Sequence, residues 1–225
     1  MDFPWHKLAK LVALHDDDLD DDSINIRHYY AMDNKQALIR FYRLLRQYGL
    51  NDSHSGNISY LHESDFYITP TGACADLLEA SELVHCTMDD TSVAAASMDQ
   101  HAHRAIYRHN PEARAVIHSH NPYTLALTLN GDDFIPVDLE GQYYFPRVPV
   151  ISISFKTYFE HSPILIATAL AEYPVVVVRG HGVYAQGQSL ELAYKWVCSL
   201  EQSAKTAFLA RQAGTFSEDH ELKLE

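Results

Sequence analysis

The sequence predicts an α/β protein in which helices cover both faces of a central, mixed or largely antiparallel sheet. Short β-branched or aromatic runs, such as Val175–Val178, predict strands. Stretches with apolar residues at three- and four-residue spacing, such as 34–48, predict helices between them. Strands and helices do not alternate strictly, so an all-parallel sheet is not expected. The chain has 225 residues, of which 47% are hydrophobic, and this suits one large globular domain.

The first half of this domain opens with a helix over 34–48, which Asp33 or Asn34 can cap and Gly49 can end. Two short strands follow at 58–61 and 65–69. Ser97 and Gln100 have the spacing of a capping box, which predicts that a helix starts there and runs through Tyr107 to about Asn110-Pro111. The second half is predicted to contain strands at 115–120, 148–153, 175–178 and 183–185 and helices at 122–129, 163–170 and 189–213, with 136–149 left undecided.

The composition of the chain limits its expected partners and its compartment. The net charge of −13 argues against nucleic acid, which usually meets a basic face. No run of 18 apolar residues occurs, so no membrane span is expected. The three cysteines, Cys74, Cys86 and Cys198, are widely spaced and suit free thiols in a reducing compartment. A cytoplasmic protein is therefore expected.

Residues 1–30 are predicted to be an acidic extension that precedes the domain at 31–225. Six aspartates lie between Asp16 and Asp22, and such a run is typical of a solvated linker. A calcium loop is the alternative, but the central Gly and terminal Glu of an EF-hand are missing.

Three histidines form the candidate metal site. Residues two apart on a strand share one face, so His118 and His120 are expected to project together. His181 lies between Gly180 and Gly182 at the end of a predicted buried strand, where the backbone can turn sharply. Three imidazoles would leave a divalent ion one open position, as in catalytic zinc sites. The alternative is that these are ordinary surface or turn histidines.

Several motifs occur together in one order, and they resemble the class II aldolase/adducin family, whose founding activity is L-fuculose-phosphate aldolase. The resemblance covers about 34–213 and rests on Ser-Gly-Asn-Ile-Ser (55–59), Ile-Thr-Pro-Thr-Gly (68–72), Ser-Met-Asp (97–99), Ala-Val-Ile-His-Ser-His (115–120) and Gly-His-Gly (180–182).

This resemblance implies an α/β/α sandwich and a homotetramer with sites between subunits. It also implies Zn²⁺ held by His118, His120 and His181, although imidazole suits other divalent transition metals. The implied activity is that of a lyase, which cleaves a small, phosphorylated ketose-like substrate by a retro-aldol reaction through a metal-stabilised enediolate.

Two carboxylates are candidates for the acid/base that the reaction needs. Asp99 matches the aldolase glutamate but is one methylene shorter, and its alternative role is to interact with a helix N-terminus. Glu140 resembles the acid/base of the methylthioribulose-phosphate dehydratase branch, and its alternative is a surface loop carboxylate. If Glu140 acts, a dehydratase, epimerase or decarboxylase becomes as plausible as an aldolase.

The resemblance assigns substrate-phosphate binding to Gly56, Asn57, Thr71, Gly72 and Ser97. Loop amides, small hydroxyls and a helix start favour an anion, although the same residues also form ordinary turns. Met98 stands where the phosphate-binding aldolases have a second serine, so the anion can also be a carboxylate. Tyr184 is a candidate to reach a neighbouring subunit. A non-catalytic, adducin-like interaction module is the alternative of another class, against which the complete histidine set argues.

Overall fold

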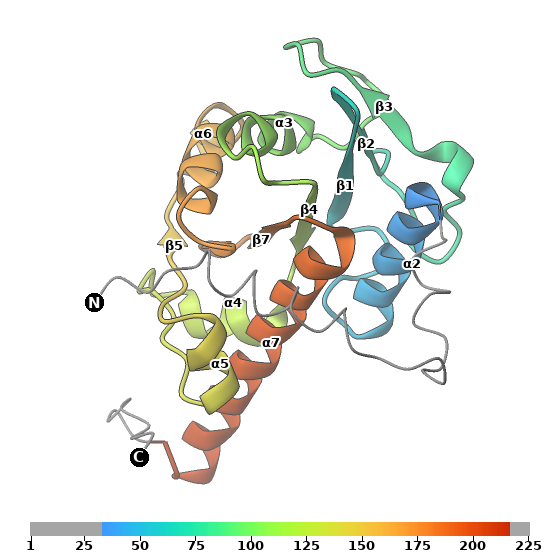
Figure 1. Ribbon diagram of the computed structural model, residues 1–225. Coiled ribbons are helices and arrows are strands. Elements are labelled where there is room, and N and C mark those ends of the chain that lie inside the picture. The colour runs from blue at the N-terminus through green and yellow to red at the C-terminus, as the bar shows by residue number, and fades with distance from the viewer. Residues whose placement is uncertain (1–32, 217–225) are drawn as a thin grey trace, which may run out of the picture. The chain divides into compact units, whose positions relative to one another are not determined.

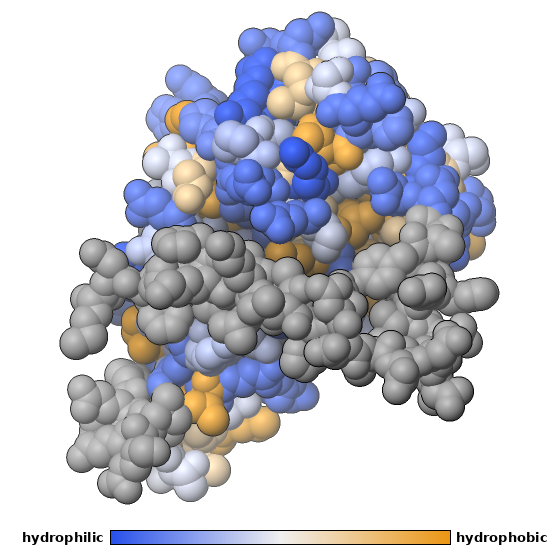
Figure 2. Space-filling model, viewed as in Figure 1, coloured by the Kyte–Doolittle hydropathy of each residue, from blue (hydrophilic) through white to orange (hydrophobic). Residues whose placement is uncertain are grey.

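The computed structural model describes residues 33–216. The predicted acidic extension at 1–30 lies outside the described residues. Within the described residues, the chain from Asn34 to Phe216 forms one compact unit. On the face shown in Figure 2, hydrophilic residues predominate over the described part, and hydrophobic residues emerge in scattered patches. Among the described helices, none is long and apolar enough to cross a membrane.

Helices and strands follow one another along this unit with few long connections. In chain order they are α2 (Asn34–Gln47), β1 (Asn57–His62), β2 (Asp65–Ile68), the 3-10 helix η2 (Ala80–Glu82), β3 (Val84–Cys86), α3 (Gln100–His109), β4 (Ala115–Ser119), α4 (Pro122–Thr128), α5 (Leu139–Tyr144), β5 (Val150–Ile151), the 3-10 helix η3 (Phe155–Thr157), α6 (Tyr158–Leu170), β6 (Val175–Val178), β7 (Gly182–Gly187) and α7 (Leu190–Ala213).

The strands form a single mixed sheet in the order β3-β2-β1-β4-β7-β6-β5. Every neighbouring pair is antiparallel except β5 and β6, which are parallel. Helices α3 and α6 cover one face, and α2 and α7 cover the other (Figure 1). The predicted central, largely antiparallel sheet between two helical layers is therefore confirmed.

Alternation along the central strand β4 supplies both hydrophobic cores. Ala115 and Ile117 face the core under α2 and α7, whereas Val116 faces the core under α3 and α6. Because the side-chain period of a strand is two, the residue after Ile117 must return to the α3/α6 face. That residue is His118, and the fold thus directs its ring to one known side of the sheet.

The glycines predicted to end α2 and α7 do so. Gly214 directly after α7 and Gly49 two residues after α2 both adopt left-handed backbone conformations, with φ of 70° and 71°. Ser189 caps α7 by accepting a hydrogen bond from the Leu192 amide at 3.1 Å. Helix α6 differs from the prediction, since it begins at Tyr158 and contains Pro163, where the sequence suggested its start.

The predicted capping box at the start of α3 is wrong. The N-cap residue is Asp99, and its side chain makes no capping hydrogen bond. Gln100 instead pairs with the backbone of Val93, accepting from its amide at 2.8 Å and donating to its carbonyl at 3.0 Å. The Gln100 side chain, which a capping box needs, is therefore bonded to the preceding loop. The Asp99 carboxylate does not cap the helix either, and instead accepts a hydrogen bond from Asn57.

Candidate metal centre and active site

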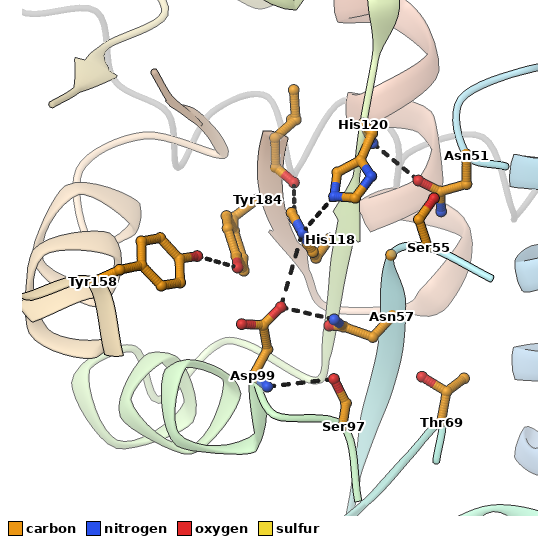
Figure 3. A network of polar contacts seen from close by, with 12 residues as sticks. Asn51, Ser55, Asn57, Thr69, Ser97, Asp99, His118, His120, Tyr158 and Tyr184 are labelled. Atoms are coloured by element: carbon orange, nitrogen blue, oxygen red, sulfur yellow. Dashed lines mark hydrogen bonds and ion pairs between the residues drawn. The ribbon is translucent and has the colours of Figure 1, made fainter. Parts of the chain in front are cut away.

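A row of polar side chains crosses the centre of the sheet on the α3/α6 face. The register pairs Asn57 of β1 with His118 of β4, and His118 with Tyr184 of β7. The His118 and Tyr184 rings stack, with centroids 4.1 Å apart and an angle of 13° between the planes. Strand pairing alone therefore sets this row, which lies at the centre of Figure 3.

His118 is held in one orientation by the neighbouring strand. Its Nδ1 lies 3.0 Å from the Val183 carbonyl oxygen, and donation there leaves Nε2 unprotonated in the neutral ring. The side chain is buried, and burial lowers its pKa to about 3, so that the ring is neutral at physiological pH. A neutral imidazole whose second nitrogen is fixed by a carbonyl is the usual form of a metal-binding histidine.

His120 and His181 approach the same point from two loops. The His120 amide donates to the Leu50 carbonyl at 2.8 Å and to Asn51 Oδ1 at 2.9 Å. The Nε2 atoms of His120 and His118 are 3.1 Å apart (Figure 3). The His181 ring centroid lies 4.8 Å from that of His118 and 5.5 Å from that of His120. Both rings therefore converge on His118, although β4 itself ends at Ser119.

Gly182 makes this convergence possible. A Cβ atom at this position would lie 2.5 Å from His118 Cε1 and 2.9 Å from His120 Cδ2. Any other residue would force the two rings to move. The neighbouring Gly180 supplies the turn that carries His181, with φ of 67°. Steric limits thus explain both glycines of the Gly-His-Gly motif.

The three imidazoles could hold one metal ion. One ligand nitrogen from each lies within 4.8 Å of the others, and within the described residues this is the only such group of His, Cys, Asp or Glu. Burial lowers the pKa of His120 and of His181, as it does for His118. Three neutral nitrogen donors this close together suit a divalent transition metal. That they are ligands remains a prediction.

The Asp99 carboxylate lies beside these rings. Its Oδ2 accepts a hydrogen bond from Asn57 Nδ2 at 2.8 Å and lies 3.8 Å from His118 Nε2 (Figure 3). Burial acts to raise the pKa of Asp99, but the nearby His118 and the hydrogen bond from Asn57 outweigh it and hold the pKa below its usual value. The structure thus places an ionised carboxylate next to the candidate metal ligands.

Two tyrosines complete this wall of the site, and the sequence did not assign them to it. The Tyr184 hydroxyl lies 2.9 Å from that of Tyr158. The Tyr158 ring packs edge-on against His181, with centroids 4.8 Å apart. Tyr184 is fully buried within its own chain, so the expectation that it reaches a neighbouring subunit is wrong. Only the strand register, which no local motif reveals, could have identified its place.

A cavity of about 200 Å³ opens over the three histidines. The residues expected to bind the anion all line it together with Asp99 and Met98; they are Gly56, Asn57, Thr71, Gly72 and Ser97. Gly56 permits the close approach of its loop, because a Cβ there would lie 2.2 Å from Asn51 Nδ2. The described residues around the cavity include no Lys or Arg, so an anion would meet amides, hydroxyls and the metal. Anion binding at these residues remains a prediction.

Glu140 lies apart from this group. It is exposed in the first turn of α5, which packs against α7, and it does not line the cavity. The α5 region belongs to the core on the opposite face of the sheet from Asp99. The chain by itself therefore does not bring Glu140 to the histidines, and its catalytic role remains a prediction.

Comparisons with known proteins agree with this architecture. The family model described as "Class II Aldolase and Adducin N-terminal domain" matches residues 36–208. The crystal structure of L-fuculose-1-phosphate aldolase from Thermus thermophilus superposes with a TM-score of 0.75 and 29% identity, covering 81% of this chain and 96% of that one.

Relatives with other activities match as well. A 3-oxo-tetronate 4-phosphate decarboxylase from Escherichia coli O6:H1 is 28% identical over 78% of this chain and 86% of its own length. A methylthioribulose-1-phosphate dehydratase from Acidiphilium cryptum is 30% identical over 65% of this chain and 76% of its own length. The family is thus shared by enzymes of different reaction types.

Proposed function

Because the chain belongs to the class II aldolase and adducin family, we propose that it is a metal-dependent lyase that cleaves a carbon–carbon bond in a small phosphorylated ketose by a retro-aldol reaction. The observation that carries this proposal is the convergence of three imidazoles beside the Asp99 carboxylate in one cavity. A structural histidine cluster would not need a buried acid 3.8 Å away or an open cavity above it.

His118, His120 and His181 would hold the ion, and Zn²⁺ is the metal that we propose. When bound, a divalent ion supplies Lewis-acid stabilisation of negative charge on substrate oxygens. The fixed Nδ1 contact of His118 supports this assignment, since it directs Nε2 into the site at no further cost in ordering.

Asp99 is the proposed acid/base. In a retro-aldol cleavage a hydroxyl loses its proton, the adjacent carbon–carbon bond breaks, and the ketone fragment takes a proton at the carbon that was released. Asp99 can accept the first proton and return it in the second step. Asn57 supports this role, because its side-chain amide holds one carboxylate oxygen in place at 2.8 Å.

The size and lining of the cavity support a small, polar substrate. Its volume of about 200 Å³ is below the roughly 300–1,000 Å³ of typical small-molecule pockets. Gly56, Thr71, Gly72 and Ser97 offer amides and hydroxyls on the wall formed by the loops that flank β1 and β2. We propose that this wall binds the phosphate.

Decarboxylation and dehydration are the alternatives, and relatives with these names support them. Either reaction could use the same metal site, with Glu140 as the acid/base in place of Asp99. The exposed position of Glu140 on α5 does not favour this role within one chain. A non-catalytic module would not retain the complete histidine set.

A product assay tests the proposal. Zinc-loaded protein would be given pentulose and hexulose 1-phosphates, and dihydroxyacetone phosphate and aldehyde would be measured together. We expect turnover that is lost in His118→Ala and Asp99→Ala and kept in Glu140→Ala. Turnover without any aldehyde, lost only in Glu140→Ala, would instead identify one of the alternatives. Protein that binds no zinc and turns over nothing would identify an interaction module.

We also propose that the protein forms a homotetramer in the cytoplasm, as the resemblance implies. Large apolar side chains along η3 and α6 support an assembled state, since Phe155 is 95% exposed and Phe159 is 61% exposed in the single chain. Light scattering of the purified protein would give the mass of the assembly, and a monomer would contradict this proposal.

A further inference from the structure

Helix α4 begins directly after His120, and it lacks the usual cap of its own. Its N-cap residue is Asn121, a residue type that normally bonds the free amides of the first turn, but no such bond forms. The side-chain Nδ2 of Asn121 instead donates to the Val197 carbonyl of α7 at 2.8 Å, and its Oδ1 accepts from the Ser119 hydroxyl at 2.7 Å. Asn121 is thus used to tie the chain to α7.

Glu201 of α7 supplies the missing cap from a distant part of the chain. Its Oε1 accepts from the Tyr123 amide at 2.9 Å, and its Oε2 accepts from the Thr124 amide at 3.1 Å and the Thr124 hydroxyl at 2.9 Å. Pro122, at the first helical position, has no amide hydrogen to satisfy. One carboxylate therefore satisfies the free amide donors of Tyr123 and Thr124.

Capping α4 with Glu201 costs free energy, because a carboxylate is buried. The Glu201 side chain is only 8% exposed, and burying a carboxylate is unfavourable even when it is hydrogen-bonded. A cap by Asn121 itself would have satisfied α4 without that cost. What the observed arrangement adds is a fixed position of residues 119–124 relative to α7.

His120 lies inside this fixed segment. On one side its amide is held by Leu50 and Asn51. On the other side the next four residues are anchored to α7 through Asn121 and Glu201. His118 needs no such support, because it is inside β4 and paired on both sides. His120 follows the last residue of the strand and depends on these contacts for its position.

We propose that Glu201 is a positioning residue for the metal centre: it caps α4 from α7, fixes the backbone that carries His120, and thereby sets the affinity of the three-histidine site for its metal. This inference rests on the proposed metal site. Glu201 does not itself touch the metal or the substrate.

The test is the zinc affinity of Glu201→Gln, measured by competition with a chromophoric chelator. Glutamine keeps the size of the side chain but replaces one acceptor oxygen by an NH₂ group. This group cannot accept the hydrogen bonds that Tyr123 and Thr124 donate to Glu201. We expect roughly tenfold weaker zinc binding, the lower end of the effect of removing a residue that supports a metal ligand. The matched control is Thr128→Val, which removes another buried hydrogen bond of α4, from the Thr128 hydroxyl to the Thr124 carbonyl at 2.8 Å, and keeps the amides and the Thr124 hydroxyl that contact Glu201.

A spectroscopic readout separates positioning from general stability. Co²⁺ in place of zinc reports ligand geometry through its visible absorption. We expect the spectrum to change in Glu201→Gln and to stay unchanged in Thr128→Val, even if both variants lose similar thermal stability. Equal zinc affinity and equal Co²⁺ spectra in Glu201→Gln and the wild type would overturn the inference.

Two further variants keep the test decisive. If Glu201→Gln does not fold, Thr124→Val removes one of the three Glu201 contacts, and a wild-type zinc affinity in that variant would overturn the inference. His118→Ala distinguishes this failure from failure of the proposed function. Zinc binding that is equally strong in His118→Ala and the wild type would refute the metal site itself, and the inference with it.

Discussion

The two faces of the central sheet differ in the side chains that the same strands present to them. Toward α2 and α7, β4 presents Ala115 and Ile117, which pack into a hydrophobic core. Toward α3 and α6, it presents Val116 and then His118, where the apolar layer gives way to polar side chains. Neighbouring residues of one strand thus serve stability on one face and chemistry on the other.

This difference shows how the fold tolerates a buried polar site. Several buried polar groups on the α3/α6 face have partners fixed by strand geometry, as with the Nδ1 of His118 and the Val183 carbonyl, although Asn57 Oδ1 and His103 Nε2 are buried without a hydrogen-bond partner. A second cluster lies one row deeper, where the Ser59 hydroxyl is 2.6 Å from His103 Nδ1 and 2.7 Å from the Tyr107 hydroxyl. On the opposite face the side chains of β4 pack by shape, and the buried polar groups lie farther out, where Asn121 and Glu201 join α4 to α7.

The largest expected effect concerns the polar face. Asp99→Asn keeps the shape of the side chain but removes its ability to exchange a proton, and we expect kcat to fall by roughly 10²–10⁴, the usual contribution of a general acid/base. Asp99→Glu restores the carboxylate with one more methylene and should retain measurable turnover. Steady-state kinetics of both variants, with zinc content verified, checks this. An Asn variant as active as the wild type would assign Asp99 to a structural role.

The apolar face should show the opposite response. Ile117→Ala removes a fully buried side chain, and we expect the free energy of unfolding to fall by about 2–5 kcal/mol. Zinc affinity should stay within experimental error, because the altered side chain faces away from His118. Urea unfolding and zinc titration of the same variant measure the two quantities. A large loss of zinc affinity would mean that the two faces are not independent.

Metal binding provides a third way to separate the faces. Zinc at 100 times its dissociation constant should stabilise the folded protein by about 2.7 kcal/mol, provided that it binds only the folded state. The stabilisation should persist in Ile117→Ala and disappear in His118→Ala. Thermal unfolding with zinc and with a chelator measures it. Equal stabilisation of His118→Ala would show that zinc binds elsewhere on the protein.

Local chemistry explains what could be predicted from the sequence. Helix α7 has its apolar spacing, its Ser189 cap and its terminal Gly214 within one continuous stretch, so its bounds followed from neighbours in the chain. The His118–His120 pair and the glycines around His181 are local in the same sense. The resemblance added the order of motifs, which brought residues such as Asn57 and Ser97 into one expected site.

Non-local pairing explains what could not be predicted. Tyr184 joins the site because β7 pairs with β4 in one register, and Tyr158 joins it because α6 begins five residues before the expected position at Pro163. The capping box failed since a loop residue, Val93, takes the side chain of Gln100. For Tyr184 the deciding partner, β4, is distant in the sequence, and for Gln100 it is Val93, which lies outside the four-residue window of the capping box.

The smallest expected effect lies at the boundary between the two kinds of packing. Tyr184→Phe keeps the ring that stacks on His118 and removes the hydroxyl, which lies 2.9 Å from that of Tyr158 and also interacts with Asp99. We expect the free energy of unfolding to fall by about 1–2 kcal/mol, the net value of these lost contacts, because Tyr158 is partly accessible and can bond to water instead. Zinc affinity should not change, since the stack on His118 persists. Urea unfolding and chelator competition check both expectations. If zinc affinity falls together with stability, the hydroxyl pair also positions the His118 ring, and the polar face is then more tightly coupled than strand register alone requires.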